Sequence, residues 1–271
     1  MALSLDARRP SIMGIVNVTP DSFFAAARTH AHSAAVERGR ELFAAGCDVV
    51  DVGGESTRPG AHEVGQDEEL SRVLDVVEAL AHYGAVSIDT RKAAVARASV
   101  RAGAVLLNDV SGTLVEVAGE LGVGYVAMHS QGTPATMQIA PHYDDVVAEV
   151  LAALEGMAQR ARSAGVTQLW LDPGIGFGKS FDHNLALIAQ CARIVDVARD
   201  CGAGVLLGTS RKGFVGHLTR DRLDVNDRLE GTLATEAWAM LEGVTMLRVH
   251  DVTPALQLRD LVTRPLAEVG A

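Results

Sequence analysis

Residues 34–60 read AAVERGRELFAAGCDVVDVGGESTRPG, and this stretch contains the pattern that decides the fold. Ala34–Ala45 has the apolar spacing of an amphipathic helix and ends at Gly46, a residue type that often terminates helices. Asp48–Val52 is an apolar run of the length of a buried strand, and the polar, glycine-rich segment Gly53–Gly60 follows it. The stretch therefore predicts a helix, a buried strand and a loop suited to binding, in that order.

The same pattern recurs along the whole chain. Seven further apolar runs are too short for helices: Ile12–Val16, Ala85–Ile88, Val105–Leu107, Gly124–Met128, Gln168–Leu171, Gly204–Leu207 and Val244–Val249. Helical periodicity is present at Asp67–Leu80, Ala93–Ala102 and Val146–Ala164. Eight strands that alternate with helices over about 250 residues favour a (β/α)8 TIM barrel over an open doubly wound sheet. No linker or close repeat divides the sequence, so we expect residues 1–271 to form a single domain.

The composition excludes several classes of protein. The chain has 271 residues, of which 48% are apolar, 21% charged and 4% aromatic, as expected for a globular protein with an aliphatic core. A net charge of −10 argues against nucleic acid or an anionic membrane as partner. The first ten residues are charged where a signal peptide is apolar, and no run reaches the roughly 18 apolar residues of a membrane span. Three scattered cysteines, Cys47, Cys191 and Cys201, favour a reducing compartment, so we expect a cytoplasmic protein.

Polar residues stand at or just past the end of every predicted strand. They are Asn17, Asp51 with Glu55, Asp89, Asn108 with Asp109, His129, Asp172, Ser210 with Arg211 and Lys212, and Arg248 with His250. Any one of them has a structural alternative, since an aspartate after a strand often caps the next helix. In a barrel, however, all these positions converge on the C-terminal mouth, where such enzymes bind their substrates. The pattern predicts an enzyme or a tight small-molecule binder.

Two of the loops carry ambiguous signals. Arg58 offers a planar charged fork to an anion, although a solvated surface arginine is the alternative. Asp172–Lys179 is not a phosphate-binding loop, because Pro173 stands where the motif G-x-x-x-x-G-K-[ST] needs glycine. Its glycines permit close approach to a flat ligand, and Phe177 is either a stacking residue or a core aromatic.

The last two predicted strands are followed by cationic residues. Gly208–Phe214 is expected to open the helix after the seventh strand, where Ser210 and Lys212 suit a carboxylate or phosphate. Arg248 and His250 are two residues apart on one strand and therefore face the same way.

Two further strand-end residues leave alternatives open. Asn17 provides a neutral oxygen for Mg²⁺, which is weak support for a metal when taken alone. His129 is either a ligand or catalytic residue, or simply a structural residue that forms hydrogen bonds.

Eight segments of the sequence, taken in their order along the chain, closely resemble the dihydropteroate synthase family. The matching stretches are Met13–Phe23, Gly53–Ala61, Ser87–Thr90, Asn108–Gly112, Met128–His129, Asp172–Lys179, Thr209–Phe214 and Arg248–Asp251. The resemblance implies an enzyme that condenses 6-hydroxymethyl-7,8-dihydropterin diphosphate with p-aminobenzoate, giving 7,8-dihydropteroate and pyrophosphate. It also implies Mg²⁺ as cofactor and a homodimer.

Carried over by position, the resemblance assigns the site residues. Asp89, Asn108, Asp172 and Lys212 are expected to bind the pterin, and Met128, Gly176 and Phe177 also belong to the substrate-binding set. Asn17, Arg58, Arg248 and His250 are expected at the diphosphate, with Mg²⁺ on Asn17, and Thr57, Pro59 and Ser210 at the aminobenzoate. The expected catalytic residues are Arg58, Asp89, Lys212, Arg248 and His250. In the family reaction pyrophosphate departs before the aniline nitrogen attacks, so the protein's task is electrostatic.

One segment departs from the family pattern. After Asp21-Ser22-Phe23 the family usually continues Ser-Asp-Gly-Gly, whereas this chain reads Phe24-Ala25-Ala26-Ala27. We expect either a lower turnover or a pocket in which sulfonamides bind poorly. Two other functions remain open on the sequence: a folate-dependent methyltransferase that serves a corrinoid protein, and a non-catalytic paralogue that binds pterin without turnover.

Overall fold

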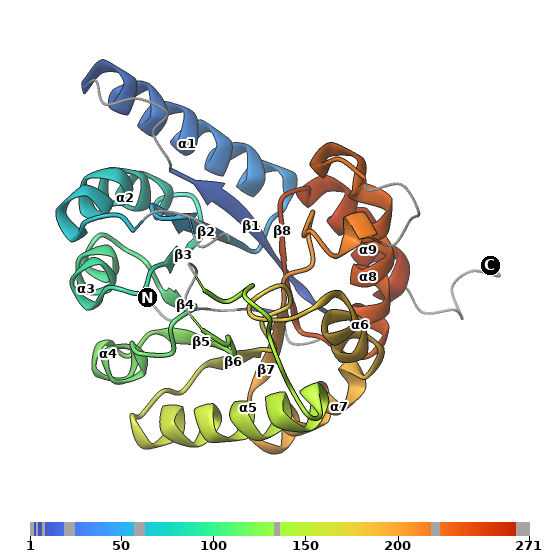
Figure 1. Cartoon of the computed structure of the whole chain (residues 1–271). Coiled ribbons are helices and arrows are strands. Elements are labelled where there is room, and N and C mark those ends of the chain that lie inside the picture. Colours follow the sequence, from blue (N-terminus) through green and yellow to red (C-terminus); the bar gives the residue numbers. More distant parts are fainter. Residues whose placement is uncertain are drawn as a thin grey trace.

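Eight parallel strands close into a barrel in sequence order, with the helices around it (Figure 1). The computed structural model describes residues 3, 5–6, 9–18, 25–56, 63–132, 136–217 and 223–263, and of residues 25–30 only the backbone. The strands are β1 (Ser11–Asn17), β2 (Val49–Gly53), β3 (Ala85–Asp89), β4 (Leu106–Asp109), β5 (Gly124–Met128), β6 (Leu169–Asp172), β7 (Gly204–Leu207) and β8 (Met246–Val249). β8 pairs with β1 and so completes the ring. The closed barrel confirms the fold predicted from the sequence.

The helices follow the strands as the periodicity predicts. They are α1 (Ala25–Ala45), α2 (Gln66–Leu80), α3 (Ala93–Arg101), α4 (Val115–Leu121), α5 (Val146–Ser163), α6 (Phe181–Ala189), α7 (Cys191–Asp200), α8 (Leu229–Leu241) and α9 (Val252–Thr263), with short 3-10 turns η1 (Val215–His217) and η2 (Val225–Asp227). The helices predicted from periodicity correspond to α2, α3 and α5 to within one residue, whereas α1 begins well before its predicted start at residue 34. In the described part of the chain, no helix has both the length and the apolar character needed to cross a membrane.

One prediction about the helices is wrong. The segment Gly208–Phe214 does not open an α-helix: its residues form turns that end in η1, and α8 begins only at Leu229. Arg211 has φ +56, a left-handed conformation that interrupts helical geometry in an L-residue. Its guanidinium makes two hydrogen bonds to the carboxylate of Asp251, at 2.7 and 2.8 Å, which hold it there.

Alternate residues of each strand point into the barrel or out toward the helices. The outward residues pack in one large apolar cluster with the helices. A second apolar cluster contains the inward residues Met13, Val49, Leu106, Val126, Leu206 and Met246, together with Leu3 from the N-terminal segment. Two positions further along five of these strands stand Asp51, Asn108, Met128, Gly208 and Arg248. Toward the C-terminal ends of the strands, the apolar layer of the barrel interior is therefore followed by a layer that contains the polar side chains of Asp51, Asn108 and Arg248, called the polar layer below.

The N-terminal end of the barrel is closed by packing and by hydrogen bonds. Leu3 is buried against the interior cluster, and its carbonyl oxygen accepts a hydrogen bond from Gln168 Nε2 at 2.8 Å. At the same end, Asp48 Oδ2 accepts from Ile12 N and from Arg259 Nη1, both at 2.8 Å, which ties α9 to the start of β2. The polar layer at the opposite end is therefore where a ligand can enter.

Candidate active site

Four side chains from β2, β3, β4 and β8 meet in the polar layer. Arg248 reaches past β1 and donates from Nε to Asp51 Oδ2 at 2.7 Å and from Nη2 to Asp89 Oδ2 at 2.9 Å. Asn108 Nδ2 donates to the same oxygen of Asp51 at 2.9 Å. Strand register brings these residues together, since Asp89 lies beside Asn108 in the ladder between β3 and β4. Three of the predicted site residues, Asp89, Asn108 and Arg248, thus lie close together in the structure. Asp51, which connects Asn108 to Arg248, was not among the predicted site residues.

Each of the two carboxylates of this group has one oxygen without a partner among the described residues, and the pKa of Asp89 is raised. Burial raises the pKa of Asp89 to about 7, against the opposing effect of Arg248 and with a further increase from the charge of Asp51. The outer oxygens, Asp51 Oδ1 and Asp89 Oδ1, are buried and have no hydrogen-bond partner among the described residues. Buried polar atoms without a partner are costly. Both oxygens are therefore suited to accept N–H groups from a bound ligand.

Asp172 and Lys212 form a second polar group at the mouth. Asp172 is buried, and its Oδ1 accepts a hydrogen bond from Gly174 N at 2.7 Å. Burial raises the pKa of Asp172, and the charge of Lys212 opposes this. Burial likewise lowers the pKa of Lys212, to about 8, while Asp172 opposes it. The two groups stabilise each other's charged forms, an arrangement that suits a ligand with adjacent donors and acceptors.

The aromatic ring of Phe177 belongs to this second group. Lys212 Nζ lies 4.7 Å from the centroid of the Phe177 ring and donates a hydrogen bond to the carbonyl oxygen of Ile175. Phe177 is half-buried and is a member of neither apolar cluster of the described residues. Of the two alternatives for this residue, the structure favours a ligand-facing ring over a core aromatic.

Ser210 and His250 lie together on the side of the mouth formed by β7 and β8. Ser210 Oγ accepts from His250 N at 3.1 Å and lies 3.1 Å from His250 Nδ1. From α1, Arg38 Nη2 donates to the carbonyl oxygen of His250 at 3.2 Å. The structure brings these two residues together, as expected of the strand ends, although no helix N-terminus supports Ser210.

Met128 and Gly176 were predicted to contact substrate, and both flank Asp172. Met128 is buried at the end of β5, where strand register pairs it with Asp172 of β6. Gly176 lies in the turn after β6, with its N–H bonded to Asn184 Oδ1 at 2.7 Å and its carbonyl to Gln138 Nε2 at 2.8 Å.

Asn17 was predicted to hold a metal ion. It ends β1 and is exposed at the mouth, beside Gly53 of β2. Among the described residues no cluster of three or more His, Cys, Asp or Glu side chains has the arrangement of a metal site. Mg²⁺ takes oxygen ligands and completes its shell with water and phosphate oxygens, so one amide oxygen does not define its site, and the assignment of Mg²⁺ to Asn17 stays a prediction.

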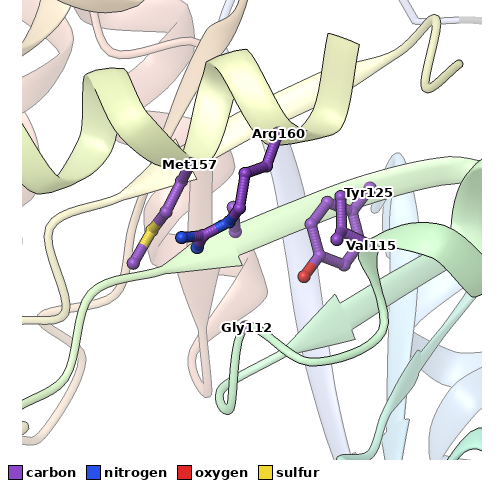
Figure 2. Close-up of a pocket in the computed structure, with 6 residues that line it drawn as sticks. Gly112, Val115, Tyr125, Met157 and Arg160 are labelled. Atoms are coloured by element: carbon purple, nitrogen blue, oxygen red, sulfur yellow. The ribbon is translucent and has the colours of Figure 1, made fainter. Parts of the chain in front are cut away.

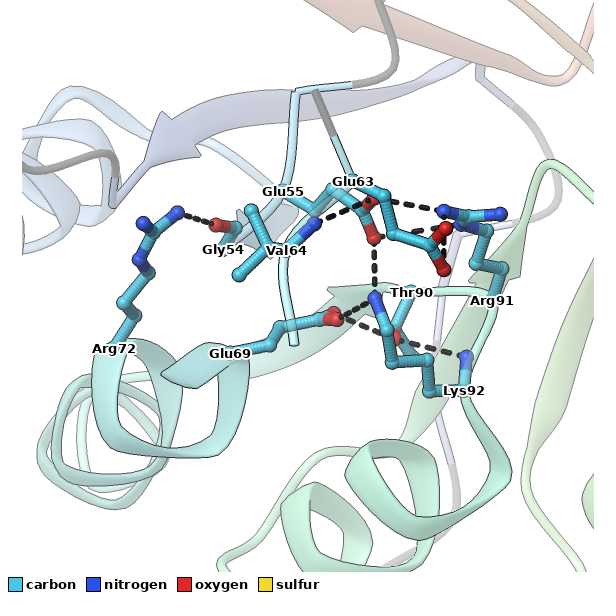
Figure 3. A network of polar contacts seen from close by, with 9 residues as sticks. All are labelled: Gly54, Glu55, Glu63, Val64, Glu69, Arg72, Thr90, Arg91 and Lys92. Carbon is cyan, nitrogen blue, oxygen red and sulfur yellow. Dashed lines mark hydrogen bonds and ion pairs between the residues drawn. The ribbon is translucent and has the colours of Figure 1, made fainter. Parts of the chain in front are cut away.

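A network of ion pairs surrounds the segment after β2 (Figure 3). Glu55 accepts from Arg91 Nη2 at 2.9 Å, from Lys92 Nζ and from Val64 N at 3.3 Å. Burial raises the pKa of Glu55, but the hydrogen bonds from Arg91 and Lys92 outweigh it and lower the pKa below its usual value. Lys92 Nζ also pairs with the buried Glu69 of α2 at 2.6 Å. Glu55 and Glu63, on either side of the 57–62 segment, are thus both ion-paired with Arg91, which follows β3.

Several predicted residues lie outside the described part of the chain. These are Thr57, Arg58, Pro59 and Phe24. Ala25-Ala26-Ala27, which replace the usual loop sequence of the family, belong to the first turn of α1. The assignments of Thr57, Arg58 and Pro59 to the aminobenzoate and the diphosphate stay predictions.

Two hollows lie outside the barrel, away from the mouth. One is lined by Gly112, Val115, Tyr125, Ala127, Met157 and Arg160 (Figure 2). Met157 and Arg160 reach it from α5, and Tyr125 from β5, where its hydroxyl donates to Asp109 Oδ2 at 2.8 Å. The other hollow is a groove between α4 and α5. Neither brings together the residue types of the mouth, which is therefore the candidate active site.

Two residues of the mouth were missed as site residues. Asp51 interrupts the apolar run Asp48–Val52 and alternates with Val49, which places it on the inward face of β2; this signal was present in the sequence. Lys179 is buried behind Asp172, where its ammonium contacts the ring of His129. His129 itself has the structural role that was one of its two alternatives. Its partner lies 50 residues away, so no local pattern indicated the pair.

Comparison with known proteins identifies the family. Residues 13–250 match the model of a family described as pterin binding enzyme. Dihydropteroate synthase of Escherichia coli (strain K12) is 41% identical over 272 residues, which cover 97% of this chain and 94% of that protein. The chain belongs to the dihydropteroate synthase family.

Solved structures of other dihydropteroate synthases share the fold. The enzyme of Yersinia pestis, in a complex with a sulfonamide drug, has a TM-score of 0.87 and 38% identity, covering 98% of this chain and 97% of that one. The enzyme of Thermus thermophilus, in complex with 4-aminobenzoate, has a TM-score of 0.84 and 42% identity, covering 95% of each chain. A second structure of the Thermus enzyme is in complex with 6HMPPP, with a TM-score of 0.81 and 40% identity, covering 95% of this chain and 94% of that one. Membership in this family sets aside the corrinoid methyltransferase alternative.

Proposed function

We propose that the chain condenses 6-hydroxymethyl-7,8-dihydropterin diphosphate with p-aminobenzoate, releasing pyrophosphate. The observation that carries this is the mouth itself. Its buried carboxylates have oxygens without a partner among the described residues, and they lie beside two half-buried cations, Lys212 and Arg248. A pterin presents ring N–H and amino donors on one edge and a carbonyl beside them, and its diphosphate is anionic. The same mouth therefore offers acceptors, a donor and positive charge to one substrate.

The pterin is assigned to the two carboxylate groups. Asp172 accepts from the amino group and ring N–H, while Lys212 leaves the carbonyl of Ile175 and donates to the pterin carbonyl. Asp89 and Asn108 bind the opposite edge of the ring, where the free oxygen of Asp89 meets a further N–H. The ring of Phe177 covers one end of this pocket, close to where the aminobenzoate attacks.

The diphosphate is assigned to the rim formed by β1 and β8. Arg248 and His250 neutralise its oxygens, and Arg58 is proposed as a third cation. Asn17 would hold Mg²⁺ through its side-chain oxygen, and the ion would supply positive charge to the diphosphate.

The reaction breaks the bond between the pterin methylene carbon and the diphosphate oxygen, whose electron pair leaves with pyrophosphate. The aniline nitrogen then forms a bond to the methylene carbon and loses a proton. Arg248 and His250 stabilise the charge that develops on the leaving group, and the carboxylates of Asp51 and Asp89 stabilise the positive charge left on the pterin. No covalent bond to the protein is needed.

The test is release of pyrophosphate from the pterin diphosphate and Mg²⁺, measured with and without p-aminobenzoate. We expect release that is coupled to dihydropteroate formation. Binding of the pterin diphosphate without release would identify the non-catalytic paralogue, to which the Phe24–Ala27 segment gives some weight. Failure to bind at all would refute the site assignment.

We further propose a homodimer that works in the cytoplasm. On α8, Trp238 and Leu241 are 48% and 71% exposed and share one face of the helix, and Leu261 of the adjacent α9 is 74% exposed. Such an apolar patch favours contact with another protein surface. All three cysteines are unpaired, which agrees with a reducing compartment. Light scattering during size-exclusion chromatography should give twice the chain mass of 28.5 kDa, and Leu241→Asp should lower it to one chain.

A further inference from the structure

The distribution of lysine in this chain points to a residue outside the family assignments made above. The sequence has 21 arginines and only three lysines, Lys92, Lys179 and Lys212. All three lie at or just beneath the mouth: Lys92 in the ion-pair network, Lys212 beside Asp172, and Lys179 behind it. An ammonium is compact and directs three donors tetrahedrally, whereas a guanidinium is planar. Lysine is thus used where several acceptors converge on one point.

Lys179 has such a set of acceptors. The residue is 2% exposed, and its Nζ lies 3.0 Å from the carbonyl oxygens of both Gly174 and Phe177 and 2.9 Å from His129 Nδ1. The carbonyl of His129 is at 3.4 Å. Burial and the nearby charge of Lys179 lower the pKa of His129 to about 4, so its ring is neutral and Nδ1 accepts. Three protons on Nζ therefore meet three close acceptors.

These contacts fix the turn that carries Phe177. Gly174 has φ +67, and a Cβ there would lie 1.8 Å from the carbonyl oxygen of His129, so the backbone at this point approaches β5 as only glycine permits. The other carbonyls of the turn are bound by side chains from elsewhere: Ile175 by Lys212, Gly176 by Gln138 and Gly178 by Tyr143. When Lys212 turns to a ligand, Lys179 still holds the carbonyls on either side of Ile175.

Lys179 also affects the charge of Asp172. Its positive charge lowers the pKa of Asp172, together with Lys212 and Arg248, against the effect of burial. The charged or titratable groups that act on Lys179 in return are Asp172, Lys212 and, by direct contact, His129. Burial lowers the pKa of Lys179 to about 7, so the ammonium is charged in the acidic range in which Asp172 would take up a proton.

We propose that Lys179 is a positioning residue for pterin binding, which fixes the Gly174–Phe177 turn through its three hydrogen bonds and keeps Asp172 ionised from the side opposite the ligand. It touches no substrate itself. The proposal rests on the proposed function, because it takes the pterin to be the ligand of Asp172.

The test compares Lys179→Met, which removes charge and donors at similar volume, with Lys179→Arg, which keeps the charge but not the three-way geometry. The control is Arg259→Met, which removes a buried cation at the opposite end of the barrel. Calorimetry measures the Kd of 6-hydroxymethyl-7,8-dihydropterin diphosphate with Mg²⁺ between pH 5 and 8, and unfolding temperatures are recorded for each variant. Lys179→Gln replaces Lys179→Met should the latter not fold.

We expect the Kd at pH 7 to rise at least about tenfold in Lys179→Met, beyond any change in Arg259→Met at a comparable loss of unfolding temperature. The pH below which the affinity for the pterin diphosphate decreases should rise by about one unit in Lys179→Met. It should be unchanged in Lys179→Arg. Asp89, with a pKa of about 7, also titrates between pH 5 and 8. Because its charged neighbours are the same in all variants, its titration does not distinguish them.

If Lys179→Met binds the pterin diphosphate with wild-type affinity and loses affinity at the same acidic pH as the wild type, the inference is overturned. Lys179 is then a purely structural residue. Failure of the wild-type protein to bind the pterin diphosphate would instead refute the proposed function. The two failures are therefore distinguishable.

Discussion

Replacing Asp172 by asparagine tests the assignment of the pterin edge, and the structure decides which way the new amide must face. Gly174 N donates to Asp172 Oδ1 at 2.7 Å. In Asp172→Asn the amide oxygen must stay at that position, because an NH₂ group there would oppose the N–H of Gly174. The NH₂ group therefore points into the mouth, where the proposed ligand presents its own N–H donors.

The loss can be estimated from this geometry. One charge-assisted hydrogen bond to the ligand, worth about 1.5–3 kcal/mol, disappears, and a donor left facing a donor costs a further 1–3 kcal/mol or so. A total of about 2.5–6 kcal/mol corresponds to a Kd weaker by roughly 10²–10⁴-fold, since each 1.4 kcal/mol is about tenfold. Stability should also fall, because Lys212 loses the charge that opposes the effect of its burial.

Calorimetric titration with the pterin diphosphate measures the effect. The matched control is Asp109→Asn, the same substitution in a buried carboxylate at the end of β4, which bonds Ser111, Leu114 and Tyr125 outside the assigned site. We expect the control to lose stability and keep its pterin affinity. If Asp172→Asn binds the pterin diphosphate within about threefold of wild type, the assigned binding edge is wrong.

Three further predictions concern other residues. Arg248→Met should weaken binding of the diphosphate-bearing pterin at least about tenfold and lower the free energy of unfolding by about 3–5 kcal/mol, because Asp51 and Asp89 lose their cation; an equal loss of affinity for pterin without diphosphate would contradict its assignment. Burial, helped by Asp251, raises the pKa of Glu236 from 4.5 to about 8, so the folded protein keeps a proton that the unfolded chain releases. The free energy of unfolding should therefore fall as the pH rises from 5 to 8, and urea titrations should show a flatter profile in Glu236→Gln. Phe24→Ser should increase sulfonamide inhibition relative to p-aminobenzoate binding, and unchanged relative inhibition in paired curves would remove Phe24 as a determinant.

The sequence predicted the strands more accurately than the site. Short apolar runs and glycines at helix ends are local signals, and the strands match the predicted runs to within about two residues at either end. The segment Gly208–Phe214 was predicted wrongly because its conformation depends on a distant partner. Arg211 is held out of a helix by Asp251, forty residues away, and no local preference indicates this.

What the sequence determined by itself is the barrel and the polar character of its C-terminal end. Both follow from alternation along single strands, in which Val49 and Asp51 share a face, and alternation needs only neighbouring residues. The tertiary structure alone decided which groups pair: Arg248 with Asp51 across 197 residues, and Lys179 with His129 across 50. Such pairs form when closure of the barrel brings strand ends together in a dry interior, where each buried charge needs a partner that the local sequence does not specify.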